Sequence, residues 1–313
     1  MDARHTLHAT QRHAGWDRSL PPVVTIEPGD SVELSCLDAS GDQLGPASTS
    51  ESIGALDLEL VNPTTGPIAV DGAQPGDALV VRIDDITIDG HWGWTALIPG
   101  FGLLADDFPD PLLLQWTLED GATVAELPGG GAQVPISPMV GTIGVAPAAP
   151  GRHSQIPPRH VGGNLDTREI RAGTVLRLPV EVPGALLSIG DLHAAQGDGE
   201  VCGTGLEVPA TVSVTVGLEQ GAAPPTPMYQ TNGPPRGAEV ADGVIATTGV
   251  RDDLMSATRD ATRAMVDHLG SAAGLDPAHA YALCSVAADL AITEVVDAPN
   301  WVVALRLPRH VLG

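Results

Sequence analysis

Glycine and proline interrupt this chain so often that few long regular elements can form. The sequence holds 37 glycines and 28 prolines among its 313 residues, and both residue types favour turns over the interiors of helices. Hydrophobic residues still make up 43% of the chain, which is enough for a sizeable core in one large domain or two. Many short strands joined by turns are therefore expected, rather than a bundle of long helices.

Over most of the chain the apolar runs have the length and alternation of strands. Segments 23–26 and 32–34 are separated by a Pro-Gly-Asp turn, and the alternating run 78–88 follows a second such turn. Segments 112–118 and 122–127 have the pattern of a hairpin. These patterns predict a fold built mainly from β-strands.

Helical spacing of apolar residues begins only near the C-terminus. It extends over 252–269 and from 276 to about 295, and a final strand is expected over 302–307. We predict a β-sandwich or barrel-like body over residues 1–216, which carries the functional site, and an α+β segment over 217–313 with two helices and a closing strand. The C-terminal segment is expected either as a separate unit or packed with the body as one unit.

Acidic residues and one histidine crowd into the stretch 186–207, LLSIGDLHAAQGDGEVCGTGLE. Asp191 and His193 stand two positions apart, so an extended chain places both side chains on one face. One oxygen and one nitrogen ligand from a single strand suit zinc or a similar divalent ion. The alternative is an ordinary solvated turn, because Asp and Gly are common turn residues. The candidate residues in this stretch are Asp191, His193, Asp198, Glu200 and Glu207.

A second polar segment lies just upstream, between two proline-marked turns. It reads HVGGNLD and contains His160, Asn164 and Asp166. A second group of oxygen and nitrogen ligands near the first strengthens the metal interpretation over the solvated-turn interpretation.

The composition of charged residues excludes several function classes. All 15 basic residues are arginine, so a lysine Schiff base, a lysine nucleophile and a P-loop lysine are excluded. The formal net charge of −24 argues against nucleic acid and anionic membranes as partners. A saline habitat and a coding bias are both open as origins of this charge.

Cysteine usage and the N-terminal sequence bear on the compartment. Cys36, Cys202 and Cys284 are far apart and odd in number, which fits a reducing cytoplasm better than a disulfide framework. Carboxylates near Cys202 would disfavour its thiolate, so we expect a small filler there rather than a nucleophile. The N-terminus lacks the apolar core of a signal peptide, and no stretch has the length and apolarity of a membrane span. We expect a cytoplasmic protein.

Aromatic residues are scarce, at 3% of the chain, yet several fall within residues 91–104. Trp92, Trp94 and Phe101 lie there in a glycine-rich apolar loop. They form either the wall of a small-molecule pocket or a local hydrophobic core under a long loop.

Seven segments between residue 13 and about 308 carry a family pattern: HAGWDRSLPPVVTIEPGD, GPIAVDGAQPGDALVVRI, HWGWTALIPGFGLLADDF, SPMVGTIGVAP, GGNLDTREI, PGALLSIGDLHAAQGDGEVCGTGLE and VVDAPNWVVALRLP. Through them the chain resembles the acetamidase/formamidase family over nearly its whole length. The resemblance implies a β-rich body, a divalent metal and hydrolysis of short aliphatic amides to a carboxylic acid and ammonia. It leaves acetamide, formamide and larger amides open as substrates.

The residues that the resemblance carries over are Asn164, Asp166, Asp191, His193, Asp198, Glu200 and Glu207. His160 is held apart from these, because it falls where the family varies. The missing lysine excludes the lysine-dependent arrangements of other amidases, and no G-x-S-x-G elbow is present. A water molecule activated by a metal is the nucleophile that is left.

We assign roles on this basis. The expected metal ligands are Asp166, Asp191 and His193, with Glu207 as the fourth ligand or a bridging group, and Glu200 is the expected proton shuttle. A further set has supporting roles: Asn164 and the amides of 162–163 for the oxyanion, Asp198 for a second ion such as calcium, and Trp92, Trp94 and Phe101 for the acyl group.

Two other function classes stay open at this point. One is a calcium-stabilised β-sandwich that binds carbohydrate on exposed tryptophans, and the other is a structural oligomer with an inactive site. The predicted second helix carries few charges and a wide apolar face, so we also expect a homo-oligomer, a dimer or a tetramer.

Overall fold

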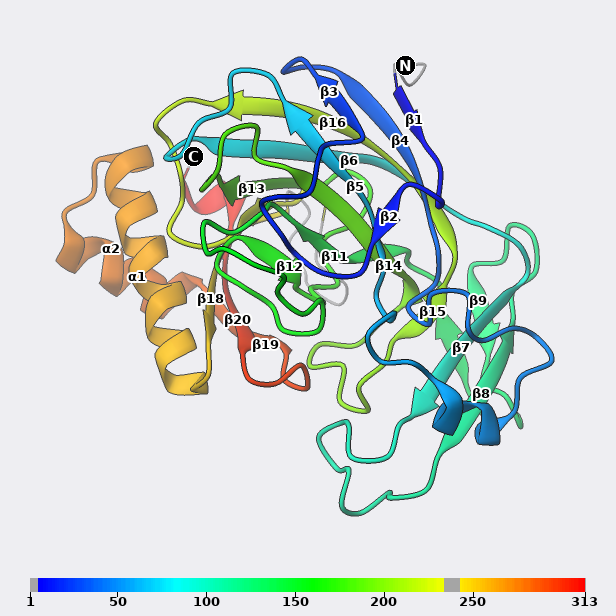
Figure 1. The fold of residues 1–313 in the computed structure, drawn as a ribbon. Helices are drawn as coiled ribbons and strands as arrows, with labels where there is room; N and C mark the ends of the chain where they lie inside the picture. Colours follow the sequence, from blue (N-terminus) through cyan, green and yellow to red (C-terminus); the bar gives the residue numbers. More distant parts are fainter. Residues whose placement is uncertain (1–4, 234–242, 313) are drawn as a thin grey trace.

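Two large β-sheets dominate the protein in the computed structural model of Figure 1, which describes residues 5–233 and 243–312. The mainly β prediction is confirmed. The first sheet has nine strands in its described part. In spatial order they are β1 (His5–Leu7), β4 (Ser31–Cys36), β16 (Ala210–Glu219), β6 (Ala78–Ile88), β13 (Val175–Pro179), β17 (Met228–Gln230), β18 (Val244–Arg251), β20 (Trp301–Pro308) and β19 (Asp289–Glu294).

The second sheet holds the buried strands on which the site is built. Its main path is β12 (Gly162–Asn164), β11 (Met139–Gly144), β14 (Leu187–Ala195), β15 (Leu206–Val208), β7 (Trp92–Leu97) and β8 (Leu112–Thr117). Strand β5 (Thr64–Val70) branches from β14 and also pairs with β2 (Arg12–His13) and β3 (Val24–Ile26). A separate two-stranded sheet joins β9 (Val124–Glu126) and β10 (Gln133–Pro135).

The main hydrophobic core takes side chains from both large sheets. Strand β4 alternates between buried and half-buried residues, so one of its faces, with Val32 and Leu34, packs inward. From the other sheet, Ile143 of β11 and Leu192 of β14 join the same cluster. Every residue of β14 is buried, which makes this strand a rigid base for the side chains that it carries.

The C-terminal segment continues the first sheet rather than forming a sheet of its own. The boundary expected at residue 216 falls inside β16, and β17, β18, β20 and β19 extend the sheet beyond β13. Helix α1 (Leu254–Ala273) packs against β18 and β20. Asp253 caps its N-terminus by accepting from the Ser256 amide at 2.8 Å, and Gly274 ends it in the left-handed conformation. Figure 1 shows α1 and α2 (Pro277–Ala287) together at one side of the sheets.

Two local predictions are wrong. The helix expected from 276 to about 295 ends at Ala287, because the following residues form β19, which pairs antiparallel with β20. The hairpin expected between 112–118 and 122–127 does not form, since β8 pairs with β7 and β9 pairs with β10. Two short 3₁₀-helices complete the described part of the fold, η1 (Ser50–Ala55) and η2 (Arg309–Leu312). Within the described residues, no helix has the length and apolar character needed to cross a membrane.

Candidate active site and metal centre

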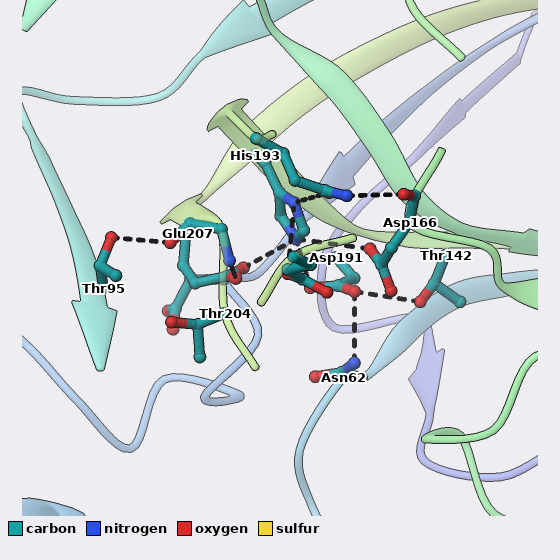
Figure 2. A network of polar contacts seen from close by, with 12 residues as sticks. Asn62, Thr95, Thr142, Asp166, Asp191, His193, Thr204 and Glu207 are labelled. Carbon is teal, nitrogen blue, oxygen red and sulfur yellow. Dashed lines mark hydrogen bonds and ion pairs between the residues drawn. The ribbon is translucent and has the colours of Figure 1, made fainter. Parts of the chain in front are cut away.

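Six ionisable side chains from five segments meet beside β14. Strand pairing sets one contact directly, because His193 on β14 stands opposite Glu207 on β15. Figure 2 shows Asp166, Asp191, His193 and Glu207 turned toward one another. None of the six is more than 7% exposed. The members are Asp166 after β12, Asp191 and His193 on β14, Glu200 in the loop between β14 and β15, Glu207 on β15, and Asp297 between β19 and β20.

The backbone adopts an uncommon conformation where it presents three of these carboxylates. Asp166, Asp191 and Glu200 have φ values of 39°, 54° and 46°, in the left-handed region that non-glycine residues seldom occupy. Such backbone persists only where the surrounding structure enforces it, and it concentrates at functional sites.

Two glycines make room for the cluster. A Cβ atom on Gly141 of β11 would lie 2.6 Å from Asp166 Oδ1 and 2.9 Å from Asp191 Oδ2. A Cβ atom on Gly205 would lie 2.5 Å from His193 Nδ1. All three distances are shorter than non-bonded atoms tolerate, so the positions of these side chains depend on the absence of a Cβ atom at both glycines.

The ligand-type atoms lie close to one imidazole nitrogen. His193 Nε2 is 3.1 Å from Glu207 Oε2, 3.3 Å from Asp191 Oδ1 and 3.9 Å from Asp166 Oδ1. On the other side of the ring, Nδ1 is 3.9 Å from Glu200 Oε1. Three overlapping groups each bring their ligand atoms within 4.8 Å of one another: Asp166 with Asp191 and His193, His193 with Glu200 and Glu207, and Asp166 with Glu200 and Asp297.

Burial and mutual repulsion shift the pKa values of the cluster. Burial raises the pKa of Asp166, Glu200 and Asp297 well above the ordinary range, and neighbouring carboxylates add to the effect. Burial also raises the pKa of Glu207 to about 7. Burial alone would lower the pKa of His193, but the charge of Glu207 and of a second neighbouring carboxylate outweighs it and raises that pKa well above its usual value. One imidazole cannot balance this many carboxylates, whereas a divalent cation would.

The oxygens that lack hydrogen bonds point to the same ligand. Among the described residues, both carboxylate oxygens of Asp166 and the Oε2 atom of Glu207 are buried without a hydrogen-bond partner. Buried carboxylate oxygens are normally satisfied, and a cation would satisfy these. The donor set, oxygens and one imidazole nitrogen, fits zinc or another divalent transition ion.

Amide side chains hold the cluster from outside. Gln196 Oε1 is 2.8 Å from His193 Nδ1, and its Nε2 donates to the backbone carbonyl oxygen of Asp166 at 2.6 Å. Asn164 donates from Nδ2 to Asp297 Oδ2 at 2.6 Å. Asn62 donates from Nδ2 to Asp191 Oδ2 at 3.2 Å. Thr142 Oγ1 has both Asn164 Oδ1 and Asp191 Oδ2 within hydrogen-bonding distance, and its single hydroxyl hydrogen is donated to one of them at a time.

A cavity of about 230 Å³ opens above the cluster. Its polar floor includes Asn62 together with the carboxylates, and Trp94 and Phe101 are among the apolar residues of its walls. The Trp94 ring is fixed there because its Nε1 donates to Asp38 Oδ1 at 3.0 Å. The shape suits a small molecule with one polar and one apolar end.

The structure brings most of the expected site residues together and places the others elsewhere. Asp198 lies outside the three groups and pairs with Arg306 at 3.0 Å and with Arg168 at 3.4 Å. Trp92 packs in a neighbouring apolar cluster and donates to Gln115, outside the cavity lining.

Other candidates also have partners away from the cluster. The amide of Gly162 donates to the Arg159 carbonyl oxygen at 3.0 Å, so it is not directed at the cavity. His160 pairs with Glu181 at 2.7 Å on the surface, and Cys202 is half-buried in the wall of an adjacent cavity.

Sequence reasoning missed three residues of the site: Asn62, Gln196 and Asp297. Asp297 lies in VVDAPNWVV, whose Asp-Ala-Pro run has the composition of a turn. Asn62 precedes a proline and likewise has the composition of a turn. Its left-handed backbone, with φ of 48°, is a signal only once the structure is known.

Comparison with known proteins identifies a family and several relatives of this chain. The model of the Acetamidase/Formamidase family matches residues 1–155 and 148–313. A formamidase of Methylophilus methylotrophus is 30% identical over 262 residues, which are 66% of this chain and 64% of that protein. An acetamidase of Mycolicibacterium smegmatis is 28% identical over 274 residues, which are 68% of this chain and 67% of that protein. The chain thus spans about two thirds or less of the curated relatives.

A solved structure agrees over almost the full length. The crystal structure of an acetamidase from Bacillus halodurans superposes with a TM-score of 0.88 at 32% identity, covering 98% of each chain.

Proposed function

The chain belongs to the acetamidase/formamidase family, and we propose that it hydrolyses the C–N bond of short neutral amides to a carboxylic acid and ammonia. The observation that carries this proposal is the buried cluster of carboxylates and one imidazole at the floor of a small, mostly apolar cavity. Amide hydrolysis needs an activated water, a proton for the leaving nitrogen and an apolar place for the acyl group, and the cavity offers positions for each.

We propose zinc, or another divalent transition ion, as the cofactor. The residues that would hold it are Asp166, Asp191, His193 and Glu207. Carboxylate oxygens of the other three lie 3.1 to 3.9 Å from His193 Nε2, and both oxygens of Asp166 and one of Glu207 lack a hydrogen-bond partner. A zinc ion bound there would supply Lewis-acid polarisation and lower the pKa of a water molecule. Asp198 has arginine partners, so a calcium site at this residue has no geometric support.

Glu200 is the proposed proton shuttle. It lines the cavity, is buried, and lies beside the His193 ring without reaching the nitrogen that faces the other carboxylates. Its carboxylate would take the proton from the attacking water and deliver it to the leaving nitrogen. Burial raises the pKa of Glu200, which brings the group closer to the pH at which it must both accept and donate.

Polar and apolar walls of the cavity would orient the amide. The lining includes several carboxylates and, among the described residues, no arginine, so an anionic substrate would be repelled. Asn164 has its amide nitrogen committed to Asp297, so we assign it to holding that carboxylate instead of the oxyanion. Asn62 on the cavity floor makes only longer contacts through its Nδ2, 3.2 Å to Asp191 Oδ2 and 3.4 Å to Asn164 Oδ1, so we propose it as the donor that polarises the substrate carbonyl. Trp94 and Phe101 would contact the acyl group.

Ammonia release tests the proposal directly. The purified protein would be assayed with formamide, acetamide, propionamide and benzamide, with and without a strong chelator, and again after zinc is returned. We expect turnover of the short aliphatic amides, loss with the chelator and recovery with zinc. Absence of turnover for all four amides in zinc-loaded protein would reject the proposed activity, while full activity in protein free of divalent metal would reject the proposed cofactor.

The carbohydrate-binding alternative finds no support in the tryptophans. Trp16, Trp94 and Trp116 are buried and Trp92 and Trp301 are half-buried, so they offer no exposed flat platform for a sugar ring.

A further inference from the structure

We propose that Gln196 is a positioning residue that fixes the tautomer of His193 and so makes the cluster able to bind a cation. The inference rests on the proposed function, because it concerns the nitrogen that would hold the metal. Gln196 is 7% exposed and follows directly after β14, the strand that carries His193. It connects the imidazole to the segment that carries Asp166.

The first step is the orientation of the Gln196 amide. One end of this amide lies 2.6 Å from the backbone carbonyl oxygen of Asp166, an atom that only accepts hydrogen bonds. The amide nitrogen must therefore face that carbonyl. The amide oxygen then faces His193 Nδ1, at 2.8 Å.

The second step is the position of the imidazole proton. The amide oxygen of Gln196 only accepts, so His193 Nδ1 must carry the hydrogen. In the neutral imidazole, the form that can bind a metal, this single N–H group leaves Nε2 with a bare lone pair, whereas an imidazolium carries hydrogen on both nitrogens. This nitrogen is the one that lies 3.1 Å from Glu207 Oε2 and 3.3 Å from Asp191 Oδ1.

The third step is what that lone pair demands. A lone pair facing two carboxylate oxygens is unfavourable unless a metal ion or a proton lies between them, and a metal ion satisfies it by displacing that proton. With the opposite tautomer, Nε2–H would donate to Asp191 and Glu207, and the cluster would close on itself as a hydrogen-bonded network. Gln196 therefore selects between two states of the same side chains, one that binds a cation and one that does not need it.

Three substitutions at Gln196 separate this role from simple packing. Gln196→Glu keeps an acceptor opposite Nδ1 in either ionisation state, so it should retain the Nδ1–H tautomer. Gln196→Met keeps the length without polar atoms. Gln196→Lys offers only donors, so Nδ1 must accept and Nε2 must carry the hydrogen. Gln155→Met is the matched control, since Gln155 is also buried but bonds to Thr64 and the backbone of His13.

Two readouts are needed, neither of them catalytic. The tautomer of His193 would be read from imidazole ¹⁵N shifts after histidine labelling, in zinc-loaded protein and in zinc-free protein at alkaline pH. Zinc affinity would be measured by competition with a chelator. We expect Gln155→Met and Gln196→Glu to stay close to wild type, Gln196→Met to lose about 10- to 100-fold in affinity, and Gln196→Lys to lose most and to show Nε2–H.

The inference is overturned if Gln196→Met or Gln196→Lys keeps both the wild-type tautomer and the wild-type affinity. It is also overturned if zinc-free wild-type protein at alkaline pH has a neutral His193 ring whose hydrogen is on Nε2, a measurement that needs no variant to fold. If the wild type is inactive but the variants change the His193 tautomer and the zinc affinity as expected, the amide hydrolysis is rejected and the role of Gln196 is kept. If the wild type is active but the Gln196 variants change neither the tautomer nor the zinc affinity, the role of Gln196 is rejected and the amide hydrolysis is kept.

Discussion

The carboxyl group of Glu200 lies 3.9 Å from His193 Nδ1, the ring nitrogen opposite the proposed metal-binding one, and within 4.8 Å of ligand atoms of Asp166 and Glu207. We predict that Glu200→Gln keeps its metal and loses turnover by about 100-fold or more, the usual contribution of general acid–base help. Asp191→Asn and His193→Ala should instead lose the metal, because each removes charge or a lone pair from the ligand set. Zinc content and ammonia release on the same samples check both statements. Metal lost from the first variant and kept in the last would exchange the two roles.

The ionisation of the buried cluster predicts how pH acts on the metal-free protein. Burial raises the pKa of Glu207 to about 7, above its ordinary value of 4.5, so the folded state binds the extra proton more tightly than the unfolded state does. The stabilising effect of the raised pKa of His193 is likewise lost as pH rises. Both shifts lower the free energy of unfolding as pH increases from about 5 to 8.

We therefore expect the Tm of chelator-treated protein to fall over this range, and the increase in Tm on adding zinc to be larger at pH 8 than at pH 5. Calorimetry at several pH values measures both. A metal-free Tm that rises steadily toward pH 8 would contradict the protonation states assigned to the cluster.

At the scale of elements, strand β11 leaves room for the site because Gly141 has no side chain. Gly141→Ala would place its methyl group against Asp166 and Asp191. We predict at least a tenfold loss of zinc affinity, because ligands must be held close to their productive geometry. Gly217→Ala on β16 is the control, since its nearest contact would be an ordinary 3.7 Å from Val80. Equal zinc affinity in the two variants would show that the carboxylates move aside at no cost.

The elements also show how far sequence patterns reach. Alternation predicted β6, and helical spacing predicted α1 and the start of α2, because these signals are local. The apolar residues of segment 289–294 have helical spacing in the sequence, but the segment forms a strand because it pairs with β20. In the same way, Asp191, His193 and Glu207 come from one stretch and were found together. Asp297 was missed, because only the pairing of β19 with β20 brings its loop to the cluster.

At the scale of the whole molecule, the C-terminal segment exposes apolar side chains in a strongly acidic chain. Tyr281 and Val286 on α2, and Leu290 and Ile292 on the edge strand β19, are between 45% and 82% exposed. Helix α2 carries no acidic or arginine residue. A chain with a net charge of −24 can approach its copy at least cost through such a face.

We predict a homo-oligomer formed through this face, which strengthens as salt screens the remaining repulsion. Light scattering at micromolar concentration measures the mass, and Val286→Asp should weaken the assembly without changing the helical content. A monomer at both low and high salt would refute the prediction, and so would a Val286→Asp variant that assembles as the wild type does.

The left-handed backbone at Asp166, Asp191 and Glu200 lowers the stability of the molecule at its site. Glycine at any of these positions would relieve the backbone and remove one buried carboxylate, so two unfavourable contributions would disappear together. Selection for heat resistance alone, applied to metal-free protein, would therefore erode the cluster first. The three acidic residues therefore have a cost in stability in the metal-free protein, and the proposed metal centre is what accounts for their presence.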